Sequence, residues 1–214
     1  MKNIVVLISG RGSNLEAILR VAAAEHWYET PGARVVAVVS NRPDAAGLAA
    51  ARSAGIATAV VEHAAFDSRD AFDAALAAEI DRHRPALVVL AGFMRVLTPG
   101  FVRHFEGRLV NIHPSLLPLF PGLETHRRAL AAGVRVHGAT VHFVSAEVDS
   151  GGIIAQAIVP VFPNDGEEEL AARVLEQEHR LLPRALRLLL EERVRLVDGR
   201  VVVSAGRAPE LLLS

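Results

Sequence analysis

The chain has 214 residues, of which 51% are hydrophobic, and this suits one domain with a sizeable buried core. Its formal net charge of −1 leaves no electrostatic footprint for nucleic acid or an anionic membrane. The absence of cysteine excludes disulfides, thiolate–zinc sites and a thiol nucleophile. No apolar run is long enough to span a membrane, and the N-terminal one is too short for a signal peptide. We therefore expect a cytoplasmic protein.

Strands and helices alternate strictly in the first half of the chain. Continuous aliphatic runs predict buried strands at residues 4–8, 35–39, 58–61, 87–90 and 109–112. Helices are expected from residue 15, over 44–54, from a cap at Asp67 or Ser68 to about Arg84, and after the loop 91–99. This alternation predicts right-handed crossovers and a parallel sheet.

The second half has a different pattern. A helix is expected at 124–133, and two longer extended runs at 137–145 and 153–162 predict at least one antiparallel pairing. A long helix at 167–193 and a hairpin of 194–197 with 201–203 follow. The fold class is therefore α/β: a Rossmann-like, three-layer open sheet, parallel in the N-terminal half and antiparallel in the C-terminal part. Because no repeat or linker forces a boundary, we expect a single domain over 1–214, with halves at about 1–105 and 106–204.

Asn111 and His113 stand at the end of the expected fifth strand, where Pro114 stops strand pairing. A spacing of two places both side chains on one side of the extended backbone. Ligands bind at strand carboxyl ends in open α/β sheets. An amide donor beside an imidazole suits a developing oxyanion and a proton in transit. The alternative is a strand-end turn whose histidine is capped by solvent or a carbonyl.

The turn after the first strand carries Gly10 and Gly12, half of a dinucleotide fingerprint. Leu15 replaces the third glycine, and no acidic residue ends the second strand, so the turn argues against NAD. No lysine is present to make a P-loop. What remains is a helix N-terminus with Ser13 and Asn14, which suits one phosphate monoester. The alternative is a plain strand–helix turn in which Ser13 or Asn14 is the N-cap.

Asp149 lies in a loop before two glycines, which permit close approach of backbone or ligand. If this loop reaches the end of the fifth strand, Asp149 faces His113, and its carboxylate favours the imidazolium form. The alternative is a hairpin-type loop in which Asp149 makes an Asx-turn. A metal site from His113, His126 and Asp149 is a further alternative, although no tight ligand spacing supports it.

Further candidates are weaker. Arg69 and Arg95 suit the anionic tail of a ligand, and their alternative is a solvated arginine on a helix or loop. His137 and His142 belong to one alternating strand but lie on opposite faces, so both cannot point at one site.

Taken together, these segments resemble the folate-dependent formyltransferases. The Asn111–His113 pair with Asp149 is similar to the signature of that group, and the Gly-Ser-Asn turn is similar to that of its phosphoribosyl-specific members. The segments that carry the resemblance extend over nearly the whole chain, at residues 8–14, 91–97, 111–118, 137–144 and 177–179.

The resemblance implies an enzyme of purine biosynthesis, a one-carbon transferase. It would transfer the formyl group of 10-formyltetrahydrofolate, its co-substrate, to the amine of 5-phosphoribosylglycinamide, giving formylglycinamide ribonucleotide and tetrahydrofolate, without a metal. The proton donor would be His113, with Asp149 favouring its protonated form and Asn111 between the substrates. Phosphate and ribose would be held by Gly12, Ser13, Asn14 and Glu178. The folate would be bound by Arg69, Met94, Arg95, Val96, Leu97 and Asn111.

The partners implied are small molecules, with no nucleic acid and no membrane, and the chain is expected as a monomer or a homodimer. Three other functions remain open. One is hydrolysis of the same folate, although water needs no phosphate anchor. A second is a non-catalytic phosphoribosyl or nucleotide sensor, which would leave Asn111, His113 and Asp149 without a role. The third is a Rossmann dehydrogenase, which the missing glycine and acidic residue weaken.

Overall fold

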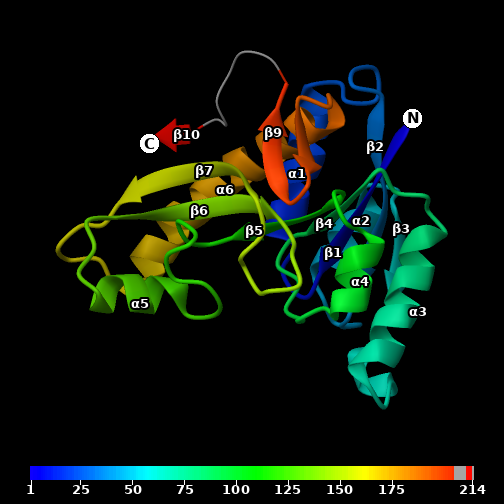
Figure 1. The fold of residues 1–214 in the computed structure, drawn as a ribbon, viewed down its shortest axis with the longest axis horizontal. Coiled ribbons are helices and arrows are strands. Elements are labelled where there is room, and N and C mark those ends of the chain that lie inside the picture. The colour runs from blue at the N-terminus through cyan, green and yellow to red at the C-terminus, as the bar shows by residue number, and fades with distance from the viewer. Residues whose placement is uncertain (205–210, 214) are drawn as a thin grey trace. The chain divides into compact units, whose positions relative to one another are not determined.

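The computed structural model describes residues 1–204 and 211–213. The described chain forms two compact units, residues 1–110 and residues 111 onward. Figure 1 shows the elements of both units.

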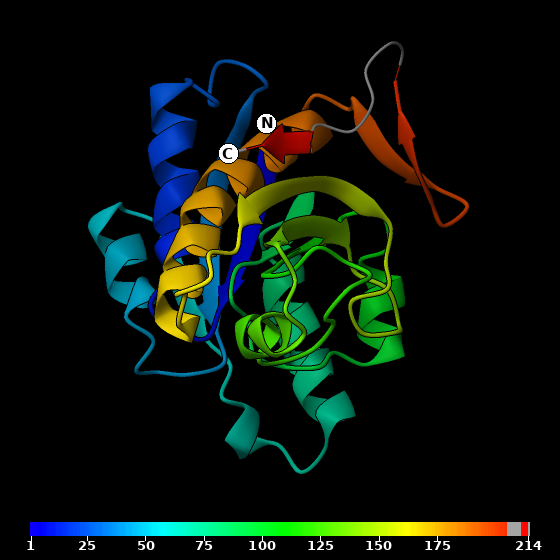
Figure 2. The same ribbon diagram turned by 90° about the vertical axis from the view of Figure 1, so that its left-hand side faces the viewer.

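The first unit is a parallel sheet with helices on both faces. Its strand order is β4-β1-β2-β3, and each neighbouring pair is parallel. Helix α1 packs beside α2, and α3 beside α4, on opposite sides of the strands (Figure 2). The strands are β1 (Lys2–Ile8), β2 (Ala33–Ser40), β3 (Ala57–Val60) and β4 (Leu87–Leu90). The helices are α1 (Ser13–Ala24), α2 (Gly47–Ser53), the 3₁₀ turn η1 (His63–Ala65), α3 (Arg69–Asp81) and α4 (Pro99–His104).

Aliphatic runs explain this sheet. The last five residues of β1 and all four of β4 are buried, as strands covered on both faces require. These buried stretches contain only aliphatic side chains, so the polar side chains that could bind a ligand lie beyond the ends of the strands. The backbone N–H of Val88 donates to the carbonyl of Arg108, so the chain that leads into β5 (Leu109–His113) lies beside β4.

The second unit contains the antiparallel part of the fold. Its strand order is β10-β7-β6-β5, with β6 and β7 antiparallel and β10 parallel to β7. Helix α6 packs against β6 and β7, and a separate antiparallel hairpin joins β8 to β9. The elements are α5 (Thr125–Ala131), β6 (Val136–Phe143), β7 (Ile153–Pro160), α6 (Glu167–Leu190), β8 (Val194–Val197), β9 (Arg200–Val203) and β10 (Leu211–Leu213).

The predicted Rossmann-like α/β class, the parallel first half and the antiparallel pairing of the second half are confirmed. Several helix ends were wrong by a few residues. Helix α2 begins at Gly47 rather than residue 44, because Asp44 pairs with Arg42 in a turn. Helix α3 ends at Asp81 because Arg84 adopts a left-handed backbone with φ 46°. Strand β10 was not predicted at all.

Candidate active site

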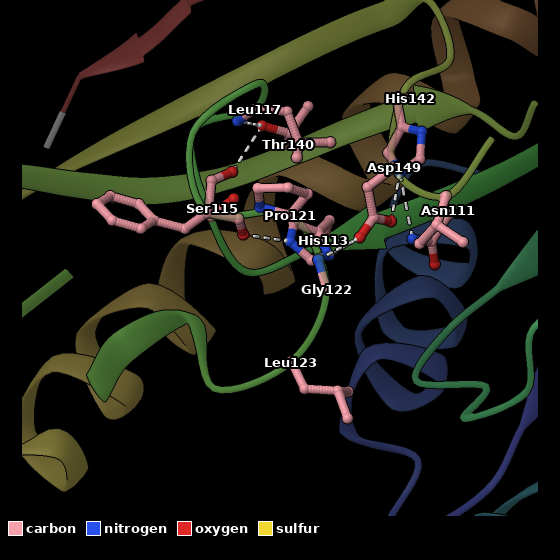
Figure 3. Close-up of polar contacts among 12 residues, drawn as sticks. Asn111, His113, Ser115, Leu117, Pro121, Gly122, Leu123, Thr140, His142 and Asp149 are labelled. Atoms are coloured by element: carbon pink, nitrogen blue, oxygen red, sulfur yellow. Dashed lines mark hydrogen bonds and ion pairs between the residues drawn. The ribbon is translucent and has the colours of Figure 1, made fainter. Parts of the chain in front are cut away.

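His113 is the last residue of β5 and is 6% exposed. Its Nδ1 lies 3.4 Å from Oδ2 of Asp149, and its Nε2 lies 3.1 Å from the carbonyl oxygen of Phe120 (Figure 3). The predicted contact between His113 and Asp149 is therefore confirmed. The carbonyl cap named by the alternative interpretation is present as well. Both ring nitrogens face oxygen acceptors, and the protonated imidazole, with two N–H donors, satisfies both.

Asp149 is held in place by the loop that follows β5. Its side chain is 10% exposed, and its Oδ2 also accepts a 2.8 Å hydrogen bond from the backbone N–H of Gly122. The backbone of Asp149 is left-handed, with φ 53°, which an aspartate adopts more easily than most residues. Since the carboxylate is bonded to the loop and to His113, it does not make the isolated Asx-turn that was the alternative.

Asn111 is oriented by a second histidine. Its Nδ2 lies 3.2 Å from Nε2 of His142, and the His142 Nδ1 lies 2.9 Å from the carbonyl of Phe143. Burial is the main cause that lowers the pKa of His142, and the bond to Phe143 and the charge of Asp149 oppose it. A neutral His142 that donates from Nδ1 accepts from Asn111 at Nε2. This leaves the other N–H of the Asn111 amide available to a ligand.

His142 is a site residue that the sequence analysis did not assign. Its Nε2 is 3.7 Å from Oδ1 of Asp149, so His142 links Asn111 to Asp149, which in turn contacts His113. The other histidine of the same strand, His137, packs instead against the rings of Phe120 and His126, at 5.8 and 5.4 Å between centroids. The two histidines thus have different contacts.

In the first unit, the turn after β1 opens a cavity of about 540 Å³. Gly12, with φ 82°, is the N-cap of α1, and no side chain caps the helix. The alternative in which Ser13 or Asn14 is the N-cap is therefore wrong, because both residues lie inside the first turn. A Cβ on Gly12 would lie 2.6 Å from the Cα of Gly47, so glycine is required. The N-terminal backbone of a twelve-residue helix is thus open toward the cavity.

The charge of this cavity favours an anion. Three arginines and no carboxylate are found among its lining residues, all of which the structure describes. Sequence reasoning missed Asn41, Arg42 and His63, which follow the neighbouring strands β2 and β3. The lining residues are Ser9, Gly10, Arg11, Gly12, Ser13, Asn14, Asn41, Arg42, His63, Ala91, Gly92, Met94 and Arg95.

The loop between β4 and α4 carries the residues expected at a folate. Met94 and Val96 are 69% and 57% exposed, although both are apolar. Arg69, the first residue of α3, donates from Nη2 to the carbonyl of Val96 at 3.0 Å. The structure therefore brings Arg69 to this loop. Exposed apolar side chains on irregular backbone suit a flat heteroaromatic ring that has hydrogen-bonding edges.

Two further expectations concern the second unit. Glu178 lies on α6 and is 7% exposed. Among the described residues, no group of three or more histidine, aspartate or glutamate side chains is placed to hold a metal ion. His126 packs against His137 rather than joining His113 and Asp149 in a ligand set. The same part of the chain contains no helix with the length and apolarity that crossing a membrane requires.

Comparison with known families decides the class of protein. Residues 2–186 match the formyl transferase family. The chain belongs to this family. It is 50% identical over 207 residues to the phosphoribosylglycinamide formyltransferase of Escherichia coli (strain K12), covering 97% of this chain and 96% of that protein. It is also 49% identical over 203 residues to the Drosophila melanogaster trifunctional purine biosynthetic protein adenosine-3, covering 95% of this chain and 14% of that protein.

Solved formyl transferases have the same fold. A phosphoribosylglycinamide formyltransferase from Coxiella burnetii superposes with a TM-score of 0.90 at 42% identity, covering 99% of this chain and 98% of that one. Glycinamide ribonucleotide transformylase 1 from Symbiobacterium toebii gives a TM-score of 0.89 at 49% identity, covering 95% and 94% of the two chains. This formyl transferase therefore has the α/β architecture of solved members of its family.

Proposed function

We propose that this formyl transferase moves the formyl group of 10-formyltetrahydrofolate to the amine of 5-phosphoribosylglycinamide. The products are formylglycinamide ribonucleotide and tetrahydrofolate, in de novo purine biosynthesis. The observation that carries the proposal is the chain of contacts Asn111–His142–Asp149–His113, which holds an amide and an imidazole at the end of β5. The name of the Escherichia coli relative supports the choice of substrate, and the name of the Drosophila melanogaster relative supports the place in purine biosynthesis.

In the proposed reaction, the substrate amine attacks the formyl carbon, and the formyl oxygen becomes an oxyanion. Asn111 donates its free N–H to that oxygen, and protonated His113 stabilises it from Nε2. One preorganised donor of this kind lowers the activation barrier by about 3–4 kcal/mol. The bond from carbon to the folate nitrogen then breaks, that nitrogen gains a proton and the attacking amine loses one. His113 and Asp149 carry this transfer, directly or through a water.

The substrate phosphate is assigned to the cavity of the first unit. Gly12, Ser13 and Asn14 offer backbone N–H groups at the start of α1, and the arginines that line the cavity, of which Arg42 is paired with Asp44, supply positive charge. Glu178 is assigned to the ribose. Because a hydrolase has no use for a phosphate anchor, this cavity supports a transferase whose acceptor is a phosphate ester.

The folate is assigned to the loop between β4 and α4. Met94, Val96 and Leu97 would contact the pteridine, with main-chain groups reading its edges, and Asn111 would reach the formyl group. Arg69 and Arg95 would face the carboxylates of the folate tail. We assign all of these roles to one cytoplasmic domain over 1–214.

The test is a spectrophotometric assay of 10-formyltetrahydrofolate consumption with and without 5-phosphoribosylglycinamide. Turnover that strictly requires the ribonucleotide is the expected result. The same acceptor without its phosphate should react with a much higher KM, since the cavity then contributes nothing to binding. Consumption without any acceptor would mean a hydrolase. Binding of the ribonucleotide without consumption would mean a sensor.

A further inference from the structure

A buried hydroxyl lies behind the loop that covers the His113–Asp149 pair. Thr140 is on β6, opposite Gln156 on β7, and it is 0% exposed. Its Oγ1 donates to the carbonyl of Ser115 at 2.7 Å and accepts from the backbone N–H of Leu117 at 3.1 Å (Figure 3). It also accepts from Nε2 of Gln156 at 3.0 Å. One donor and two acceptors exhaust the capacity of a hydroxyl, so Thr140 is fully engaged.

These bonds fix the turn that follows β5. The N–H of Ser115 donates to the carbonyl of His113 at 2.9 Å, and its Oγ donates to the carbonyl of Leu119 at 2.6 Å. Gln156 donates to the carbonyl of Leu117 at 2.9 Å. Hydrogen bonds therefore hold residues 115–119 at both ends and at Leu117 in the middle. The bonds at Leu117 come from Thr140 and from Gln156, which itself donates to Thr140.

The turn at residues 115–119 places Phe120 next to His113. Phe120 has a left-handed backbone, with φ 54°, which a bulky residue rarely adopts unless its neighbours impose it. In this conformation its carbonyl lies 3.1 Å from Nε2 of His113, and two residues later Gly122 bonds Asp149. The loop thus contacts both members of the pair. An imidazole bonded only at Nδ1 can still swing, whereas a second bond at Nε2 fixes the plane of its ring.

We propose that Thr140 is a positioning residue for His113. Through the turn at 115–119, its hydroxyl places the Phe120 carbonyl on Nε2, so that the imidazole is held ready before any substrate binds. In the ligand-free protein the Phe120 carbonyl oxygen accepts from the His113 Nε2 proton. During the reaction the formyl oxygen replaces it as the acceptor. Preorganised donors need no rearrangement at the moment of reaction, so loss of this support lowers kcat more than it raises KM. The kinetic part rests on the proposed function, while the placement of His113 does not.

If Thr140 only stabilised the fold, its loss would lower the thermal midpoint without changing His113. Two variants distinguish this structural role from the positioning role. Thr140→Val preserves the shape of the side chain and removes every bond of the hydroxyl, and Thr140→Ser retains the hydroxyl. Thr58→Val is the matched control, because it removes the bond that this threonine of β3, in the first unit, makes with Arg52. The readouts are kcat, KM, thermal midpoint and the NMR signal of the His113 Nε2 proton in ¹⁵N-histidine-labelled, ligand-free protein.

For Thr140→Val we expect kcat to fall about ten- to hundredfold with KM within about threefold, and the Nε2 proton to exchange with water at least about tenfold faster. Thr140→Ser and Thr58→Val should stay within about twofold of the unchanged protein in kcat. A lowered thermal midpoint with an unchanged Nε2 signal and unchanged kcat would overturn the proposal. If Thr140→Val does not fold, Gln156→Met is measured with the same criteria, because it removes one hydrogen bond to the turn, at Leu117, and one to the Thr140 hydroxyl.

Failure of the proposed function would be recognised separately. If the unchanged protein consumes no 10-formyltetrahydrofolate, the kinetic expectation has no basis, yet the NMR comparison still decides whether Thr140 positions His113. Equal exchange of the Nε2 proton in all variants would then reject the positioning role by itself.

Discussion

At the scale of single residues, the site depends on what each ring nitrogen faces. His113 is buried between a carboxylate and a carbonyl, both of which are acceptors, whereas His142 is buried with one carbonyl and one amide, which suits its neutral form. Two histidines in contact with one Asp149 therefore differ in what they can do. Under the proposed function the first moves a proton, and the second contacts the Asn111 amide and sets its direction.

Replacement of Asp149 by asparagine tests the first task. An asparagine can still accept from the Gly122 N–H, so the loop contact is preserved while the charge facing His113 is removed. We expect kcat to fall by about 10²–10⁴-fold with little change in KM, because proton transfer and not binding is affected. Steady-state kinetics check this. Asp81→Asn, at an ion pair with His104 in the first unit, is the control, and an equal loss there would reject the assignment.

His137 gives a prediction for pH. Burial, with a smaller contribution from the charge of His126, lowers its pKa from 6.5 to about 4. The unfolded chain therefore binds a proton at higher pH than the folded chain, so stability is complete above pH 6.5 and is lost as pH falls from 6.5 toward 4. The share of this one group is on the order of 2 kcal/mol.

Urea unfolding between pH 7.5 and 4.5 measures this share. In His137→Gln, the free energy of unfolding should decline less steeply below pH 6.5 than in the unchanged protein. Identical slopes in the two proteins would mean that His137 is not the group that resists protonation.

At the scale of elements, the junction of β1 and α1 is set by two glycines. Gly12 ends the turn with φ 82° and lies against Gly47 of α2. This close approach lets the first turn of α1 open onto the cavity without a side chain in between. The requirement for glycine therefore comes from a neighbouring helix as well as from the backbone angle.

Gly12→Ala should destabilise the protein by about 1–3 kcal/mol and weaken binding of the phosphate substrate, since its Cβ forces α1 and α2 apart. Gly32→Ala is the matched control, because Gly32 has φ 75° but no atom within 4 Å of the place that a Cβ would take. Denaturant unfolding and KM of both variants separate the two causes. An equal loss of stability in both would assign the effect to the backbone angle alone.

At the scale of the whole molecule, the proposal of a single domain predicts one cooperative transition. Trp27, the one tryptophan of the sequence, is buried in the first unit, and the 24-residue helix α6 belongs to the second. Tryptophan fluorescence and far-ultraviolet circular dichroism should therefore give coincident denaturation curves. A fluorescence midpoint clearly separated from that of circular dichroism would mean that the two units unfold independently.

Local patterns were sufficient for most of the fold. Aliphatic runs located β1, β2, β4 and β5, and the proline after His113 marked where β5 ends, because these signals act within a few residues. They also located Asn111 and His113 at a strand end and Gly12 at a helix start. Helix ends were less predictable: α3 ends at Asp81, and Arg84, just before Pro85, has a left-handed backbone that its residue type does not indicate.

The sequence by itself determined the α/β class, the strand-end pair and the glycine turn before α1. Only the tertiary structure decided that His142 orients Asn111, that Phe120 caps His113 and that Gly47 requires Gly12. The physical reason is distance along the chain: Asn111 and His142 meet through the arrangement of β5 and β6. Periodicity describes one element at a time, whereas these contacts join elements.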